Sequence, residues 1–154
     1  MTGTLNVLLA ARDEGAKRVV YSASSSAYGF QDRLPLSEDM PAKPLNPYGL
    51  SKYIGEELCA QFTNFYGLGT ISLRYFNPIG SHFSGLIGDC SADKPCNLIP
   101  IICEVAKGVR EKLIVSGEDY NTIDGSCVRD YIHVVDLAKS HVSALHYLLK
   151  KPKK

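Results

Sequence analysis

The chain has 154 residues, of which 45% are hydrophobic and 21% are charged, and its 17 basic and 16 acidic side chains leave a formal net charge of +1. This balance excludes a bulk electrostatic attraction to nucleic acid or to an anionic membrane surface. The composition is typical of a globular protein rather than of a disordered chain or a coiled coil, and no apolar run approaches the roughly 18 residues of a membrane span.

The amino-terminal part is predicted to form a helix, a strand and a long loop. The run 4–12 is rich in Leu and Ala, which favours a helix, and Gly15 lies near its end. The apolar residues 18–21 follow and predict a short buried strand. Residues 22–47 hold turn formers and four prolines, so a long surface loop is expected there.

The next predicted element is a helix of roughly five turns that begins at Asn46. Asn46 is a good N-cap, and Pro47 suits the first helical position. Apolar side chains then recur at helical spacing, at Ile54, Leu58, Phe62 and Phe65. The Gly-Leu-Gly sequence at 67–69 ends this helix, and the alternating residues 70–75 predict a strand. Helix and strand therefore alternate, which predicts an α/β fold with parallel strands.

The carboxyl-terminal half is predicted to be less regular. Residues 76–96 are rich in Gly, Pro and Ser and predict an extended loop. A further helix is expected to end at Gly108, and its apolar positions are Leu98, Ile102 and Val105. A short strand is expected at 113–115 and a polar loop at 117–127. The last helix carries Ala138, Val142, Leu145 and Leu149 on one face, and the basic residues that follow it are interpreted as a solvated end.

The cysteines form an odd set without the CxxC spacing of a structural zinc site or a redox motif. They are Cys59, Cys90, Cys96, Cys103 and Cys127. The first fifteen residues also lack the basic-then-apolar pattern of a secretion signal. We therefore expect reduced thiols, no metal site and a cytoplasmic location.

The sharpest candidate for chemistry is the pair Tyr48 and Lys52. On a helix these side chains lie one turn apart on one face, which is about 120° from the apolar stripe at ~100° per residue, so they need not point into the core. A lysine ammonium beside a phenol favours the phenolate, and such a pair can act as a general acid and base. The alternative is a coincidental pair on an ordinary surface helix.

Polar residues also follow the predicted strands. The sequence Ser-Ala-Ser-Ser-Ser at 22–26 comes directly after the first strand, where side chains reach a ligand in an open α/β sheet; the alternative is a serine-rich turn. Asn77 follows the next strand and is suited to bind a substrate hydroxyl or phosphate, and Arg129 is suited to bind a diphosphate. Alternatively, Arg129 forms a local ion pair with Asp130, and His133 is a buried hydrogen-bonding residue rather than a ligand.

Four segments together carry a resemblance to a known family. They are a serine-rich strand end with Ala-Tyr-Gly (22–29), Asn-Pro-Tyr-Gly-x-Ser-Lys (46–52), Leu-Arg-Tyr-Phe-Asn-Pro-x-Gly (73–80) and Val-Arg-Asp-Tyr-Ile-His-Val-x-Asp-Leu-Ala (128–138). In this combination the chain resembles the extended short-chain dehydrogenase/reductases, and within them the UDP-glucose 4-epimerase family. The resemblance runs from about Gly3 to the end of the final helix.

The resemblance implies an α/β chain that holds the second half of a Rossmann-type parallel sheet and part of a smaller α/β substrate domain. Residues 1–80 would belong to the NAD-binding domain, 81–130 to the UDP-sugar domain, 131–150 to a helix that packs back on the core, and 151–154 to a basic tail. The implied reaction interconverts UDP-glucose and UDP-galactose by oxidation and re-reduction at C4 of the sugar, with NAD as cofactor. The resemblance also implies a homodimer in complete members. The charge balance and the absence of a long apolar run predict neither nucleic acid nor a membrane as partner.

Roles for individual residues follow from the same resemblance. Tyr48 would remove the proton of the sugar 4-hydroxyl, Lys52 would hold the nicotinamide ribose, and Ser24 would hydrogen-bond the reacting oxygen. The positions that match cofactor contacts are Tyr48, Lys52, Tyr75 and Phe76. The positions that match substrate contacts are Ser24, Ser25, Ser26, Asn77, Asn97, Leu98, Ile114, Val115, Ser116 and Arg129, the last of these at the diphosphate.

Some features depart from the family pattern. Cys96 stands in place of an asparagine, Ser116 in place of an aromatic residue, and Ala23 in place of a serine. No GxGxxG or GxxGxxG motif occurs, so the backbone turn that approaches the pyrophosphate of a dinucleotide is not among these 154 residues. A nucleotide-sugar dehydratase would carry Asp-Glu where Ser25 and Ser26 stand, and no G-x-S-x-G motif supports a serine hydrolase. A non-catalytic remnant that only binds a partner is the remaining alternative.

Overall fold

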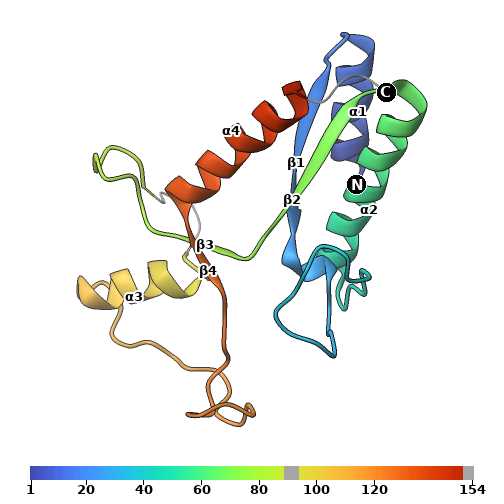
Figure 1. Cartoon of the computed structure of the whole chain (residues 1–154). Helices are drawn as coiled ribbons and strands as arrows, with labels where there is room; N and C mark the ends of the chain where they lie inside the picture. The colour runs from blue at the N-terminus through green and yellow to red at the C-terminus, as the bar shows by residue number, and fades with distance from the viewer. Residues whose placement is uncertain (89–93, 151–154) are drawn as a thin grey trace. The chain divides into compact units, whose positions relative to one another are not determined.

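The computed structural model describes residues 1–88 and 94–150, which form two compact units (Figure 1). The first unit joins Met1–Phe76 to the helix that continues from Asp136, and the second comprises Asn77–Val135. The helices are α1 (Thr2–Asp13), α2 (Pro47–Tyr66), α3 (Leu98–Ala106) and α4 (Val134–Lys150), with a 3-10 turn, η1 (Ser25–Ala27). The strands are β1 (Arg18–Ser24), β2 (Gly69–Tyr75), β3 (Asn77–Ile79) and β4 (Tyr131–His133). Cys90 and the tail predicted at 151–154 lie outside the described residues.

A parallel pair of strands organises the first unit and confirms the predicted α/β arrangement. β1 and β2 pair from Arg18 with Gly69 to Ser24 with Tyr75. α1 and α2 lie on one side of this sheet and α4 on the other (Figure 1). The buried core between the sheet and the first two helices consists of Leu8, Cys59, Phe62 and Leu68. Because α2 connects two parallel strands, it begins at the edge of the sheet where β1 ends.

The predicted start and end of α2 are confirmed. The side-chain oxygen of Asn46 accepts a hydrogen bond from the backbone N–H of Gly49 at 2.8 Å, and Pro47 is the first helical residue. Gly67 follows the last turn with a φ of 66°, a left-handed conformation that glycine adopts without a Cβ clash. The cap matters for the site because it determines where the first turn, which contains Tyr48, begins.

β1 is longer than the sequence predicts. The sequence places its end at Tyr21, but the ladder with β2 continues through Ser24, and the 3-10 turn η1 follows directly. Ala23 and Ser24 are buried, with exposed fractions of 2% and 7%. Small and polar residues join a strand when a neighbouring strand supplies the hydrogen bonds, and β2 does so here. We call residues 24–28, which span the strand end and η1, the serine turn.

The buried faces of α2 and α4 differ from the predicted apolar stripes. Phe62 is buried as expected, but Phe65 is 77% exposed, and the buried side of α2 also holds Gly55 and Cys59. On α4 the buried side chains are Ala144 and Leu148, and the exposed ones include Val142, Leu145 and Leu149. Small residues allow a helix to approach a sheet closely, so the packed face is decided by shape as well as by hydrophobicity.

The second unit holds a parallel strand pair that the sequence does not predict. β3 pairs with β4, and Asn77 lies opposite Tyr131. α3 confirms the predicted helix. Residues 113–115 do not form the predicted strand, and Ile114 and Val115 are 75% and 60% exposed. A strand needs a neighbour for its backbone hydrogen bonds, and a run of apolar residues does not by itself supply one.

Candidate active site at the carboxyl end of the first sheet

Tyr48 and Lys52 lie in the first turns of α2, near the carboxyl end of β1. The Nζ atom of Lys52 donates a hydrogen bond to the carbonyl oxygen of Ser22 at 2.9 Å and lies 5.7 Å from the centre of the Tyr48 ring. Tyr48 is 57% exposed. The sequence places Tyr48 and Lys52 on a different helix face from the apolar side chains of α2. In the structure, Lys52 lies in the same helical row as the buried residues Gly55 and Cys59. The ammonium therefore bridges the helix and the strand end, beside an accessible phenol.

Ser24 combines a structural role with a free donor. Its Oγ accepts a hydrogen bond from the backbone N–H of Ser26 at 3.2 Å and so caps η1. A serine hydroxyl has one donor and two acceptor positions, so this bond does not use the O–H, which has no acceptor assigned among the described residues. Ser25 and Ser26 form the turn itself. The serine-rich segment is thus a turn, and it also places the largely buried hydroxyl of Ser24 at the end of β1.

Gly49 brings α2 close to the serine turn. A Cβ atom at this position would lie 2.5 Å from the carbonyl oxygen of Ser26 and 3.3 Å from Cβ of Pro44. A real Cβ does not approach a backbone oxygen so closely, so this contact requires glycine. Because Tyr48 directly precedes Gly49, the close approach places the tyrosine next to the serine turn.

Tyr75 ends β2 and contacts α4 through His141. Its hydroxyl lies 2.8 Å from Nε2 of His141, and Nδ1 of the same ring lies 2.9 Å from the carbonyl oxygen of Leu137. A carbonyl only accepts, so Nδ1 carries a proton, and in a neutral ring Nε2 then accepts from Tyr75. Phe76 follows and is 38% exposed. The sequence reasoning missed His141, since no local pattern relates positions 75 and 141.

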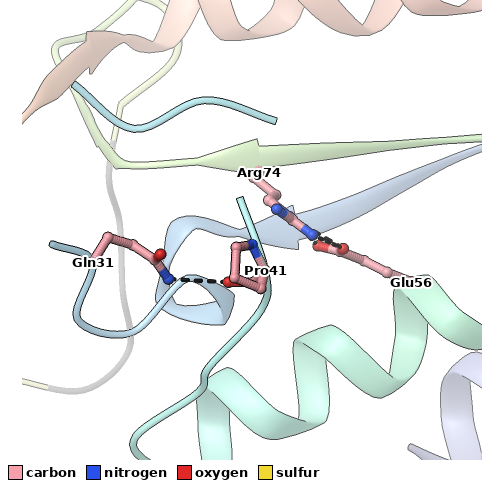
Figure 2. A network of polar contacts seen from close by, with 4 residues as sticks. All are labelled: Gln31, Pro41, Glu56 and Arg74. Atoms are coloured by element: carbon pink, nitrogen blue, oxygen red, sulfur yellow. Dashed lines mark hydrogen bonds and ion pairs between the residues drawn. The ribbon is translucent and has the colours of Figure 1, made fainter. Parts of the chain in front are cut away.

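An ion pair joins β2 to α2 and was also missed. The Nε atom of Arg74 donates to both carboxylate oxygens of Glu56 at 2.9 and 3.1 Å, and Nη2 donates to one of them at 2.6 Å (Figure 2). The hydrogen bonds with Glu56 raise the pKa of Arg74, so the guanidinium stays charged. The sequence carried one signal that could have drawn attention to Glu56. It lies four residues after Lys52, so the two side chains share one helix face.

The loop after the serine turn is tied back to it. The side-chain amide nitrogen of Gln31 donates to the carbonyl oxygens of Tyr28 and Pro41, at 2.5 and 3.0 Å, and Figure 2 shows the second of these bonds. The backbone N–H of Lys43 donates to the carbonyl oxygen of Ala27 at 3.0 Å. These bonds connect the end of η1 to the segment that leads into α2.

An open hollow of about 480 Å³ lies beside Lys52. Its lining comes from α1, β1 and α2, and most of it is apolar. The polar side chains among its lining residues are Thr4, Tyr21, Ser22, Ser51 and Lys52.

Two groups of the first unit, the buried Cys59 and the partly buried Tyr21, have raised pKa values. Burial raises the pKa of Cys59 to about 11, so this thiol stays protonated and unreactive at neutral pH. Burial also raises the pKa of Tyr21. Within residues 1–88 and 94–150, no group of His, Cys, Asp and Glu side chains is arranged to hold a metal ion. The helices in this part of the chain are too short or too polar to cross a bilayer.

Three predicted residues lie around the β3–β4 pair in the second unit. The Nδ2 atom of Asn77 donates to the carbonyl oxygen of Asp130 at 2.7 Å. Arg129 is exposed, and no ion pair joins it to Asp130 among the described residues, so the alternative of a local ion pair is not formed there. His133 is hydrogen-bonded as expected, through Nδ1 to the N–H of Val135 at 3.2 Å, but it is exposed rather than buried.

The remaining predicted residues lie elsewhere in the second unit. Asn97 is the N-cap residue of α3, without a side-chain capping bond, and Leu98 is the first helical residue and is 44% exposed. Ile114, Val115 and Ser116 are exposed in irregular chain. The structure therefore brings together the predicted residues of the first unit, and the second unit presents its own predicted residues on its surface.

Comparison with known proteins identifies the relatives of this chain. Residues 1–154 match the model of the NAD dependent epimerase/dehydratase family. The chain is 48% identical over 153 residues to the UDP-glucose 4-epimerase of Mus musculus, which covers 96% of this chain and 43% of that protein. The crystal structure of UDP-glucose 4-epimerase from Brucella ovis in complex with NAD matches with a TM-score of 0.92 and 41% identity, over 97% of this chain and 46% of that one.

A second solved structure gives a similar result. The UDP-glucose-4-epimerase from Stenotrophomonas maltophila, with bound NAD and formylated UDP-arabinopyranose, matches with a TM-score of 0.91 and 42% identity, over 97% of this chain and 45% of that one. The chain spans 22% to 45% of the length of the curated relatives that it matches. These matches confirm the predicted Rossmann-type α/β fold, and the chain belongs to the NAD dependent epimerase/dehydratase family.

Proposed function

We propose that this chain carries the proton-transfer residues and part of the substrate site of an enzyme that interconverts UDP-glucose and UDP-galactose, with NAD as cofactor. One observation carries the proposal. Tyr48 and Lys52 lie at the carboxyl end of a parallel sheet, beside the turn that presents Ser24, in a chain 48% identical to a UDP-glucose 4-epimerase. The carboxyl end of the strands is where open α/β sheets bind their ligands.

In this proposal Tyr48 is the acid–base group. Acting as a phenolate, Tyr48 would take the proton of the sugar 4-hydroxyl and later return a proton to the same oxygen. The free O–H of Ser24 donates to that oxygen and keeps it near Tyr48. The chemistry that NAD would supply when bound is reversible hydride transfer at C4 of the sugar.

The residues of this chain suit the nicotinamide half of NAD. The Lys52 ammonium has three donors, and among the described residues the carbonyl oxygen of Ser22 is its one hydrogen-bond partner, so two N–H groups remain for the ribose hydroxyls. Tyr75 lies opposite Ser24 in the strand ladder, and Phe76 follows it at the same sheet edge. The glycine-rich turn that binds the pyrophosphate is not among these 154 residues, so the proposal assigns this chain the nicotinamide half only.

Each unit by itself carries residues that we propose as UDP-sugar contacts. The proposed contacts are Ser24, Ser25 and Ser26 in the first unit and Asn77, Asn97, Leu98, Ile114, Val115, Ser116 and Arg129 in the second. A net charge of +1 supplies little general attraction, so the diphosphate depends on a local cation, and the exposed Arg129 is our candidate. Asn77 donates to Asp130 and keeps its side-chain oxygen to accept from a substrate hydroxyl. The proposal includes a homodimer for complete family members and a cytoplasmic location.

A second candidate is a module that binds a partner without catalysis. The observation in its favour is that β1 pairs with β2 alone among the described residues, so its other edge keeps unpaired backbone groups beside the hollow. A dehydratase is the weaker alternative, because Ser25 and Ser26 stand where its acidic pair would be needed.

The test is conversion of UDP-galactose to UDP-glucose by the purified chain, together with a measurement of co-purifying NAD. We compare Tyr48→Phe with Tyr53→Phe, which removes a hydroxyl from the same helix outside the site. Turnover should fall by at least about 100-fold in Tyr48→Phe and stay unchanged in Tyr53→Phe, with UDP-sugar binding retained in both. Turnover that survives Tyr48→Phe refutes the role of Tyr48. An unmodified chain that binds neither NAD nor UDP-sugar would favour the second candidate.

A further inference from the structure

The Arg74–Glu56 ion pair lies between the segments that carry the proposed catalytic groups. Glu56 is one turn beyond Lys52 on α2, on the same helix face. Arg74 is the ladder partner of Ala23, which directly precedes Ser24 in β1. The ion pair therefore links α2, which carries Tyr48 and Lys52, to β2 at the position next to the end of β1. The serine turn follows directly from that end of β1.

Tyr28 connects the same guanidinium to the serine turn. The guanidinium carbon of Arg74 lies 4.4 Å from the centre of the Tyr28 ring, and Tyr28 is only 4% exposed. The backbone N–H of Tyr28 donates to the carbonyl oxygen of Ser25 at 3.0 Å, so this ring is fixed at the end of η1. Arg74 thus contacts the helix through an ion pair and the serine turn through a cation–π contact.

The ion pair is not easily replaced by water. The side chains of Arg74 and Glu56 are 19% and 11% exposed. The Nη1 atom of Arg74 is buried and has no hydrogen-bond partner among the described residues. Removing the carboxylate would leave a half-buried positive charge without its counterion, which drives the guanidinium towards water and away from Tyr28.

We propose that Arg74 and Glu56 are positioning residues that hold the serine turn and the first turns of α2 (residues 47–52) at a fixed spacing. They act through Tyr28 and through the helix, without touching the substrate. Whether this spacing matters for catalysis rests on the proposed function. That Arg74 and Glu56 hold the spacing is independent of the proposed function. A residue that only stabilises the fold protects every segment of the first unit equally, whereas a positioning residue protects the serine turn selectively.

Amide hydrogen exchange of the intact chain, followed by NMR, separates these two roles. In Glu56→Gln the amides of Ser26, Tyr28 and Gly49 should exchange about tenfold faster or more, while the amides of α1 change less than about twofold. The matched control is Glu57→Gln, which removes the same charge from the neighbouring exposed position and should change neither group. A uniform rise in both groups, or no rise in either, overturns the proposal.

A second variant covers the case in which Glu56→Gln does not fold. Arg74→Lys keeps the positive charge and loses the two-pronged geometry, so the same local pattern is expected, and a uniform or absent change again overturns the proposal. The exchange measurement uses no substrate. A local change together with UDP-galactose turnover that survives Tyr48→Phe would therefore refute the proposed function alone, and conversion that depends on Tyr48 without a local change would refute the positioning role alone.

Discussion

Replacing Gly49 by alanine perturbs the close approach of α2 to the serine turn. The added Cβ would lie 2.5 Å from the carbonyl oxygen of Ser26, 3.1 Å from its carbonyl carbon and 3.3 Å from Cβ of Pro44. Two of these three atoms belong to the backbone, so no side-chain rotation relieves the overlap. The serine turn, or the first turn of the helix, has to move.

The expected loss of stability is the difference between two effects. Alanine is favoured over glycine by about 1 kcal/mol inside a helix. Overpacking a close contact costs about 1–3 kcal/mol, and a backbone contact is at the upper end because it cannot relax locally. We therefore expect a net destabilisation of about 1–2 kcal/mol, which for a chain of this size lowers the unfolding midpoint by roughly 2–8 °C.

Thermal unfolding followed by circular dichroism measures this difference. The matched control is Gly3→Ala, because Gly3 lies in α1 and its added Cβ would meet no atom within 4 Å. This variant should unfold at the same temperature as the unmodified chain or slightly higher. The reasoning is refuted if Gly49→Ala unfolds at or above the midpoint of the unmodified chain, since the helix-propensity gain would then outweigh a contact that we take to be a clash.

Two further predictions concern Cys59 and the cap of α2. The Cys59 thiol keeps its proton up to a pKa of about 11 in the folded chain, whereas an ordinary thiol ionises near 9, so stability should fall as the pH rises between these values. Denaturant unfolding at several pH values measures this effect, and a Cys59→Ala variant whose stability falls as much would contradict it. Asn46→Ala removes the bond to the Gly49 N–H and should cost about 1 kcal/mol in urea unfolding, while Asn64→Ala at an exposed position of the same helix should cost nothing; equal effects would exclude a capping role.

Local signals explain why much of the first unit was predictable. The start of α2 needs only an N-cap and a proline, and its end needs only a glycine, so Asn46, Pro47 and Gly67 determine both without reference to the rest of the chain. The same applies to the one-turn spacing of Tyr48 and Lys52, which is a property of any helix.

Predictions that depended on a distant neighbour were less successful. The sequence ended β1 too early because Ala23 and Ser24 have weak strand propensity, and only the ladder with β2 keeps them in the strand. It placed a strand at 113–115 because apolar residues favour one, yet no neighbouring strand is present there in the described structure. It placed Phe65 on the packed face of α2, which Gly55 and Cys59 occupy instead.

The sequence by itself determined the alternation of helix and strand, the caps of α2 and the motifs that resemble the epimerase family, because each of these is written in residues close together along the chain. The tertiary structure decided which groups meet. The bond from Lys52 to Ser22, the contact of Gly49 with Ser26 and the ion pair of Arg74 with Glu56 all join separate elements. Such contacts depend on register and on the closeness of packing, which arise only when the elements assemble.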